Sequence, residues 1–87
     1  MYTVVIRKSA VKTIRKMPPH IRRVVPLLME DLREYRSPWR QWPHYSRIGK
    51  DRFHCHLAFQ WVACWTCSEA TMTIEVYYAG SREKAPY

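Results

Sequence analysis

The sequence lacks any apolar run that approaches the roughly 18 residues of a membrane-spanning helix. Its first apolar stretch, residues 2–6, meets Arg7 and Lys8 too soon to form the hydrophobic segment of a secretory signal. Cysteine is scarce and odd in number, which argues against a disulfide framework and predicts reduced, buried thiols. The cysteines are Cys55, Cys64 and Cys67. We therefore expect a cytoplasmic protein with no membrane partner.

Acidic residues are also few, with 7 Asp and Glu against 15 Lys and Arg and a formal net charge of +8. The first acidic residue is Glu30, so every charged side chain in the N-terminal third of the chain is basic. A charge balance of this kind favours an anionic partner, of which nucleic acid is the leading class. The chain of 87 residues contains no repeat, low-complexity tract or long linker, and residues 1–87 are predicted to form a single domain.

Two helices are predicted in the N-terminal half. Apolar residues recur at helical spacing over residues 9–17, and we expect Ser9 to be the N-cap of this first helix. Pro18–Pro19 ends it and starts a second helix, which carries a continuous apolar stripe to about Arg36. Pro26 falls inside that stripe and is expected to kink the second helix.

Short stretches rich in β-branched and aromatic residues are predicted to form strands. A loop with two prolines, residues 37–43, lies between the second predicted helix and the last four of these strands. The predicted strands are residues 2–6, 45–48, 52–59, 61–67 and 72–79. The order β-α-α-β-β-β-β predicts an α+β domain, in which both helices pack on one face of a mainly antiparallel sheet.

Alternation along the strand at residues 52–59 separates two sets of side chains. Phe53, Cys55 and Leu57 are expected to face the helices, because successive strand residues point to opposite faces. His54 and His56 then share the open face. Two histidines on one strand face are a candidate acid/base pair.

The last strand and the residues after it complete this candidate site. Ile74, Val76 and Tyr78 are expected to point inward, which leaves Glu75 and Tyr77 on the open face, close to the histidines if the two strands are neighbours. Gly80 is expected to allow a sharp change of direction. Arg82 and Tyr87 follow this glycine and are expected to lie near the same site. The arginine guanidinium carries several N–H donors in a planar arrangement that suits phosphate.

Two other interpretations of conspicuous residues are disfavoured. Cys64 and Cys67 have CxxC spacing, but on a regular strand they point to opposite faces, and Cys55 points away from both histidines, so we expect no metal site. The tryptophans are interpreted as packing anchors. They are Trp39, Trp42, Trp61 and Trp65.

The whole chain resembles the RelE/ParE superfamily of bacterial toxin–antitoxin toxins. Its most specific piece is Gly80-Ser81-Arg82-Glu83 followed by Tyr87, which resembles RelE-type messenger-RNA interferases. His54 stands where RelE itself has an arginine. This is a departure from the RelE pattern, although histidines do the proton-transfer work in HigB- and YoeB-like relatives.

The resemblance implies a ribosome-dependent mRNA endonuclease that inhibits translation and needs no metal or organic cofactor. The RNA's own 2′-hydroxyl would attack the scissile phosphate, so a proton acceptor, cationic stabilisation and a proton donor are required. The implied roles are Arg82 at the phosphate, His54 or His56 in proton transfer, and Tyr87 in base stacking or acid/base work.

Further residues are assigned to RNA binding. Arg47, Lys50 and Arg52 are expected to hold backbone phosphates, and Tyr77 is a weaker candidate for stacking a neighbouring base. The resemblance implies a cognate antitoxin, mRNA and the ribosome as partners. Two alternatives remain open: a ParE-like inhibitor of DNA gyrase, and a basic nucleic-acid-binding protein without catalysis.

Overall fold

A computed structural model describes residues 1–34 and 41–86. Its elements are β1 (Thr3–Ile6), α1 (Lys8–Arg15), α2 (Pro19–Arg22), α3 (Val24–Glu34), β2 (Ser46–Arg47), β3 (Arg52–Ala58), β4 (Trp61–Ser68) and β5 (Thr73–Ser81). The strands form one five-stranded sheet in the order β1-β5-β4-β3-β2. β1 pairs with β5 in parallel, and the other neighbours are antiparallel. The predicted α+β class with a mainly antiparallel sheet is confirmed.

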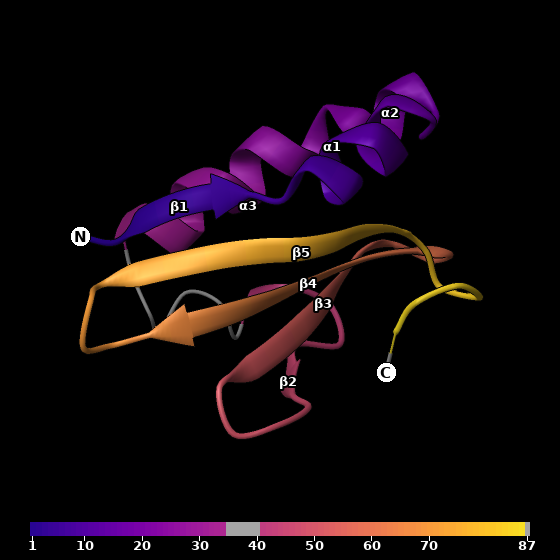
Figure 1. Ribbon diagram of the computed structural model, residues 1–87. Helices are drawn as coiled ribbons and strands as arrows, with labels where there is room; N and C mark the ends of the chain where they lie inside the picture. The colour runs from indigo at the N-terminus through magenta and orange to yellow at the C-terminus, as the bar shows by residue number, and fades with distance from the viewer. Residues whose placement is uncertain (35–40, 87) are drawn as a thin grey trace.

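The helices gather on one side of the sheet, as predicted (Figure 1). α3 contributes Leu28 and Leu32 to the core, and both side chains are fully buried against sheet residues that include Trp65, Ile74 and Val76. Burying an aliphatic or aromatic side chain of this size contributes about 1.5–3 kcal/mol. Packing of α3 is therefore a main source of the sheet's stability. Of the helices in the described part of the chain, none is long and apolar enough to cross a membrane.

The tryptophans that the structure describes are packing residues, as predicted. Trp65 is fully buried in the core, and Trp42 and Trp61 pack against it while partly exposed. The indole Nε1 of Trp42 also donates a hydrogen bond of 2.8 Å to Asp31 on α3. This bond ties the segment before β2 to the helical layer. Trp39 lies outside the described residues.

Helix α1 begins one residue earlier than predicted. Arg7 occupies the N-cap position, and no side chain caps the helix, so the assignment of Ser9 as N-cap is wrong. Ser9 lies in the first turn, and its carbonyl accepts a hydrogen bond of 3.2 Å from the Thr13 hydroxyl. Regular helix ends at Arg15, two residues before the predicted end.

The predicted second helix is divided into α2 and α3 at Arg23. Pro26 consequently lies in the first turn of α3, where the missing N–H needs no helical partner. The expected kink at Pro26 is therefore wrong, because the helix breaks before the proline instead of bending at it. The predicted end near Arg36 lies outside the described residues.

The C-terminal strand is longer than expected. Gly80 lies inside β5 and has no positive φ, so the predicted sharp turn at this glycine is wrong. A Cβ at Gly80 would lie 2.9 Å from the hydroxyl oxygen of Tyr78, so close packing is what favours glycine here. The chain leaves the sheet only after Ser81.

A β-bulge changes the side-chain alternation of β5. Cys64 lies opposite Tyr78 and Trp65 lies opposite Val76, which leaves Tyr77 as the extra residue. Ile74 and Val76 face the core as predicted, but the assignment of Tyr78 to the core is wrong, and Ala79 packs there instead. β4 also separates β5 from β3, so Glu75 and Tyr77 are not on a strand adjacent to the histidines.

Candidate active site

Alternation along β3 places its histidines as predicted. Cys55 and Leu57 belong to the core cluster, and His54 and His56 lie on the opposite face of the sheet. These histidines are 9% and 8% exposed, so they do not face open solvent. The segment before β2 approaches the same strand, because the His56 backbone N–H donates a 2.8 Å hydrogen bond to the Pro43 carbonyl. The alternation in the sequence predicted on which face of the sheet the histidines lie, but it did not predict that the segment before β2 packs against this strand.

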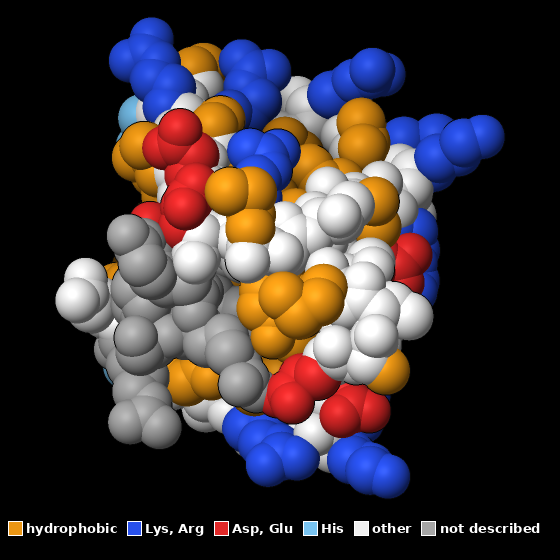
Figure 2. All heavy atoms as spheres, turned by 90° about the vertical axis from the view of Figure 1, so that its left-hand side faces the viewer, with side chains coloured by type: hydrophobic (Ala, Val, Ile, Leu, Met, Phe, Trp, Pro, Cys, Tyr) orange, Lys and Arg blue, Asp and Glu red, His pale blue; other side chains and the backbone are white. Residues whose placement is uncertain are grey.

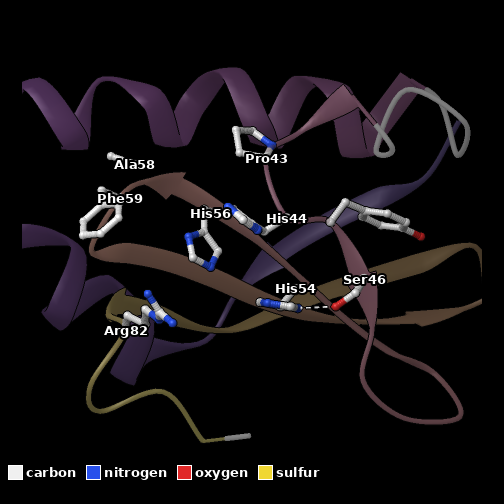
Figure 3. A pocket seen from close by; sticks show the side chains of 9 residues that line it. Pro43, His44, Ser46, His54, His56, Ala58, Phe59 and Arg82 are labelled. Atoms are coloured by element: carbon white, nitrogen blue, oxygen red, sulfur yellow. Dashed lines mark hydrogen bonds between the residues drawn. The ribbon is translucent and has the colours of Figure 1, made fainter.

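A cavity of about 780 Å³ lies next to the two histidines. Its lining residues are Pro43, His44, Tyr45, Ser46, His54, His56, Ala58, Phe59 and Arg82. In Figure 3, Phe59 and Arg82 lie at one end, His54 and Ser46 lie at the other, and His56 and His44 lie between them. The β2 region, β3 and the segment after β5 thus converge on one cavity.

The His54 ring is held by a neighbouring strand. Its Nδ1 atom is 2.9 Å from the Ser46 hydroxyl oxygen, across the register pair Ser46 and His54 (Figure 3). Burial lowers the pKa of the His54 imidazole below its ordinary value of 6.5. A hydrogen bond with the Ser46 backbone opposes part of this shift, and the charge of His44 adds a smaller lowering. At neutral pH the ring is therefore a neutral, oriented proton acceptor.

His56 lies in the middle of the cluster. Its ring centroid is 4.5 Å from that of His44 and 5.9 Å from that of His54. Burial is the main cause that lowers the pKa of His56, followed by His44, His54 and the Arg82 guanidinium. The lowered pKa keeps both histidines neutral at pH 7, and a neutral ring has a nitrogen free to accept a proton, as a general base requires.

His44 is a third histidine at this site, and the sequence pattern did not predict it. His44 has a φ of 54°, which is uncommon for a non-glycine residue and often marks a functional position. Its side chain is exposed and its ring lies against His56. One signal was available in the sequence, because Pro43-His44 comes directly before the strand predicted at residues 45–48.

The backbone of Arg82 is held by a hydrogen bond, and its side chain is exposed to solvent. Its N–H donates a 2.8 Å hydrogen bond to the Gln60 carbonyl, which joins the start of the C-terminal segment to the β3–β4 hairpin. The side chain is exposed at the cavity rim (Figure 3). Arg82 can therefore meet an anion entering the cavity. Tyr87, the remaining predicted catalytic residue, lies outside the described residues.

The basic residues predicted to hold backbone phosphates do not line the cavity. The Arg47 guanidinium donates hydrogen bonds to the carbonyls of Gly49, at 3.0 Å, and of Lys50, and so braces the β2–β3 turn. Arg52 folds over the same turn, with its Nε 2.8 Å from the place a Cβ would take on Gly49. Their assignment to RNA binding stays a prediction.

Tyr77 lies away from the cavity, beside the sheet edge formed by β1. The Arg7 guanidinium lies 5.6 Å from the centroid of the Tyr77 ring, and Arg7 also forms an ion pair of 2.9 Å with Glu75. Burial raises the pKa of the Tyr77 hydroxyl, and the nearby Cys64 raises it further. With Arg7 over its ring, Tyr77 is a poorer stacking surface than its strand position suggested.

All three cysteines are free and buried. Burial raises the pKa of Cys55 to about 12 and that of Cys64 to about 11, so neither supplies a thiolate at neutral pH. Cys55 and Cys67 lie in the core cluster, on the other face from the histidines. Within the described ranges, no three or more His, Cys, Asp and Glu side chains are placed to hold a metal ion.

The lowered histidine pKa values predict that the protein loses stability as the pH falls below 6.5. In that range the unfolded chain binds protons that the buried His54 and His56 rings resist, so acid favours the unfolded state. Urea denaturation at pH 7.5 and 5.5 measures the effect. The loss should shrink in the double variant His54→Gln/His56→Gln and persist in His20→Gln, which changes an exposed histidine on α2. Equal losses in all three proteins would contradict the prediction.

Solved structures of RelE toxins share this architecture. The archaeal RelE–RelB complex from Pyrococcus horikoshii OT3 matches with a TM-score of 0.71 and 20% identity, over 97% of this chain and 98% of that chain. The RelBE2 toxin–antitoxin complex from Mycobacterium tuberculosis matches with a TM-score of 0.69 and 21% identity, over 93% of this chain and 98% of that chain. The isolated E. coli RelE toxin matches with a TM-score of 0.71 and 18% identity, over 99% of this chain and 89% of that chain.

No protein-family model matches the sequence, and no curated protein matches it. At this level of identity the three-dimensional likeness establishes architecture, since one fold can carry different functions. The chain has the RelE toxin fold.

Proposed function

We propose that this protein is the toxin of a toxin–antitoxin pair and that it cleaves mRNA on the ribosome. The observation that carries the proposal is the cavity in which two buried, neutral histidines lie beside an exposed arginine. A gyrase-binding surface or a passive nucleic-acid-binding surface needs no such set of proton-transfer groups. The RelE fold and the net charge of +8 support the same assignment.

The proposed reaction begins when His54 or His56 accepts the proton of the RNA 2′-hydroxyl. The 2′-oxygen attacks the adjacent phosphorus, a 2′,3′-cyclic phosphate forms, and the bond to the 5′-oxygen of the next nucleotide breaks. Arg82 stabilises the charge that builds on the phosphoryl oxygens. A second group protonates the leaving 5′-oxygen, and this proton donor is Tyr87, or the other histidine once it has itself taken up a proton. No metal or organic cofactor takes part.

The proposed partners follow from the same comparison. The matching structures from Pyrococcus horikoshii and Mycobacterium tuberculosis are toxin–antitoxin complexes. We propose that a cognate antitoxin binds this chain as well, and that mRNA and the ribosome are its targets in the cytoplasm. A basic protein of this kind attracts an acidic or amphipathic segment, and the binding should weaken with salt where charges dominate.

The test is cleavage of a defined mRNA on translating ribosomes, with cut sites mapped by primer extension. Purified protein should cut the mRNA, and a 2′-deoxy substitution at a mapped site should abolish that cut because the attacking hydroxyl is gone. A DNA gyrase supercoiling assay runs in parallel. Inhibition of gyrase without mRNA cleavage would replace the proposal with the ParE-like alternative, and RNA binding without products would replace it with a non-catalytic binder.

A further inference from the structure

The tip of the β3–β4 hairpin carries an unusually exposed aromatic side chain. Phe59 is 78% exposed, and Ala58 pairs with Trp61, so Phe59 and Gln60 form the loop. Loops of this length are usually polar and favour glycine, asparagine or aspartate. Phenylalanine is therefore not the residue that the turn itself selects.

The backbone of this hairpin gives no structural reason for the phenylalanine either. Among the described non-glycine residues, only His44 and Met72 have positive φ, so the loop is not one of the common mirror-image turns. A register irregularity between His56 and Ala58 adapts the strands to the loop instead. The Phe59 side chain is also not among those that pack against the core.

Phe59 borders two cavities at once. It lines the histidine cavity, and it lines a second cavity of about 500 Å³. The second cavity is lined by Phe59, Gln60, Trp61, Ser81, Arg82 and Glu83. Arg82 also borders both cavities, and the two side chains lie at the same end of the site in Figure 3. An exposed ring and an exposed guanidinium thus border both cavities.

From this arrangement we infer that Phe59 is a stacking platform for a base of single-stranded RNA. The nucleotide next to the scissile phosphate places its base on the Phe59 ring in the second cavity, and its phosphate meets Arg82. The inference rests on the proposed function and adds a base-binding subsite to it. An aromatic face beside a cation is the usual way to hold an unpaired base, because every base has a flat face.

Charge favours RNA over an apolar protein segment as the occupant. The second cavity is bordered by the polar or charged side chains of Gln60, Ser81, Arg82 and Glu83, in a chain with net charge +8. Figure 2 shows the opposite end of the sheet, where the β4–β5 turn lies and acidic, basic and apolar side chains are interspersed. Met72 is an exposed apolar residue in that turn and serves as a matched control.

The experiment measures the binding of a short fluorescent single-stranded RNA, made non-cleavable by 2′-deoxy substitution, by fluorescence anisotropy. Phe59→Ala should weaken binding about tenfold or more, Phe59→Leu should weaken it similarly, and Phe59→Trp should retain it. Met72→Ala should bind like the wild type. Because Phe59 is outside the core, unchanged thermal melting should accompany every result.

Each outcome decides the inference separately from the nuclease proposal. If Phe59→Leu binds as well as the wild type, hydrophobic contact and not stacking holds the ligand, and the inference is overturned. Unchanged binding by Phe59→Ala, or no binding by the wild type, overturns it as well. RNA binding that depends on Phe59, in a wild type that cuts no mRNA on ribosomes, supports the subsite while the nuclease proposal fails.

Discussion

Replacing Arg82 with alanine should lower mRNA cleavage by a factor of about 10² to 10³. The guanidinium is the exposed cation at the rim of the histidine cavity, and the proposed transition state accumulates charge on phosphoryl oxygens at that place. The fold should survive, because the structural hydrogen bond of Arg82 to Gln60 is made by the backbone N–H, which alanine retains. Single-turnover cleavage on programmed ribosomes and growth inhibition in cells measure the effect, with circular dichroism to verify folding.

Two further variants sharpen this prediction. Arg82→Lys keeps a positive charge without the planar fork, so its activity should fall between that of the wild type and that of the alanine variant. Lys84→Ala removes a nearby exposed cation outside both cavities and should retain full activity. Equal loss in the Arg82 and Lys84 variants would mean that net charge matters and that Arg82 has no specific role. Full cleavage by Arg82→Ala would remove this residue from the proposed mechanism.

Replacing the buried histidines should have an effect of similar size. General acid/base catalysis contributes about 10² to 10⁴ in rate, so His54→Gln or His56→Gln should lower cleavage within that range if the residue transfers the proton. Glutamine retains a polar side chain that can hydrogen-bond in the site but cannot take up the proton. The variant with the larger loss identifies the general base. Single-turnover rates should be measured at several pH values, because the wild-type rate should fall as the base is protonated below pH 6.5.

His20→Gln is the control for this pair, since His20 is exposed on α2 and does not line the cavity. Ser46→Ala tests whether orientation matters, because it removes the hydroxyl that lies 2.9 Å from His54 Nδ1. That variant should show a smaller loss than His54→Gln. Wild-type rates in both His54→Gln and His56→Gln would contradict the proton-transfer assignment and favour a non-catalytic function.

Much of the architecture was predictable because it depends on local patterns. The apolar stripe through Leu28 and Leu32 has the period of a helix, and it predicts which face of α3 packs on the sheet. The alternation at His54 and His56 has the period of a strand, and it predicts that both rings share the face opposite Cys55. Such periodicities depend on residues that are close together in the sequence, so they can be recognised without knowing which strands pair.

The same local reasoning failed where a residue's surroundings come from elsewhere in the chain. The side chains of β5 alternate regularly up to Val76, and the bulge at Tyr77 then reverses the alternation. The bulge arises from pairing with β4 and places Tyr78 on the histidine face. This outcome depends on contacts between distant segments. Pro26 predicts a kink, yet the helix breaks at Arg23, which places the proline in the first turn of α3.

The sequence by itself determined the fold class and the shared face of His54 and His56, because charge, composition and periodicity act within short stretches. The tertiary structure decided that β4 separates β5 from the histidine strand and that the segment before β2 lies against His56. It also brought His44 against His56 and Arg82 to the rim of their cavity. The physical reason is that strand order, burial and the lowered histidine pKa values come from residues distant in sequence that become neighbours only in the folded chain.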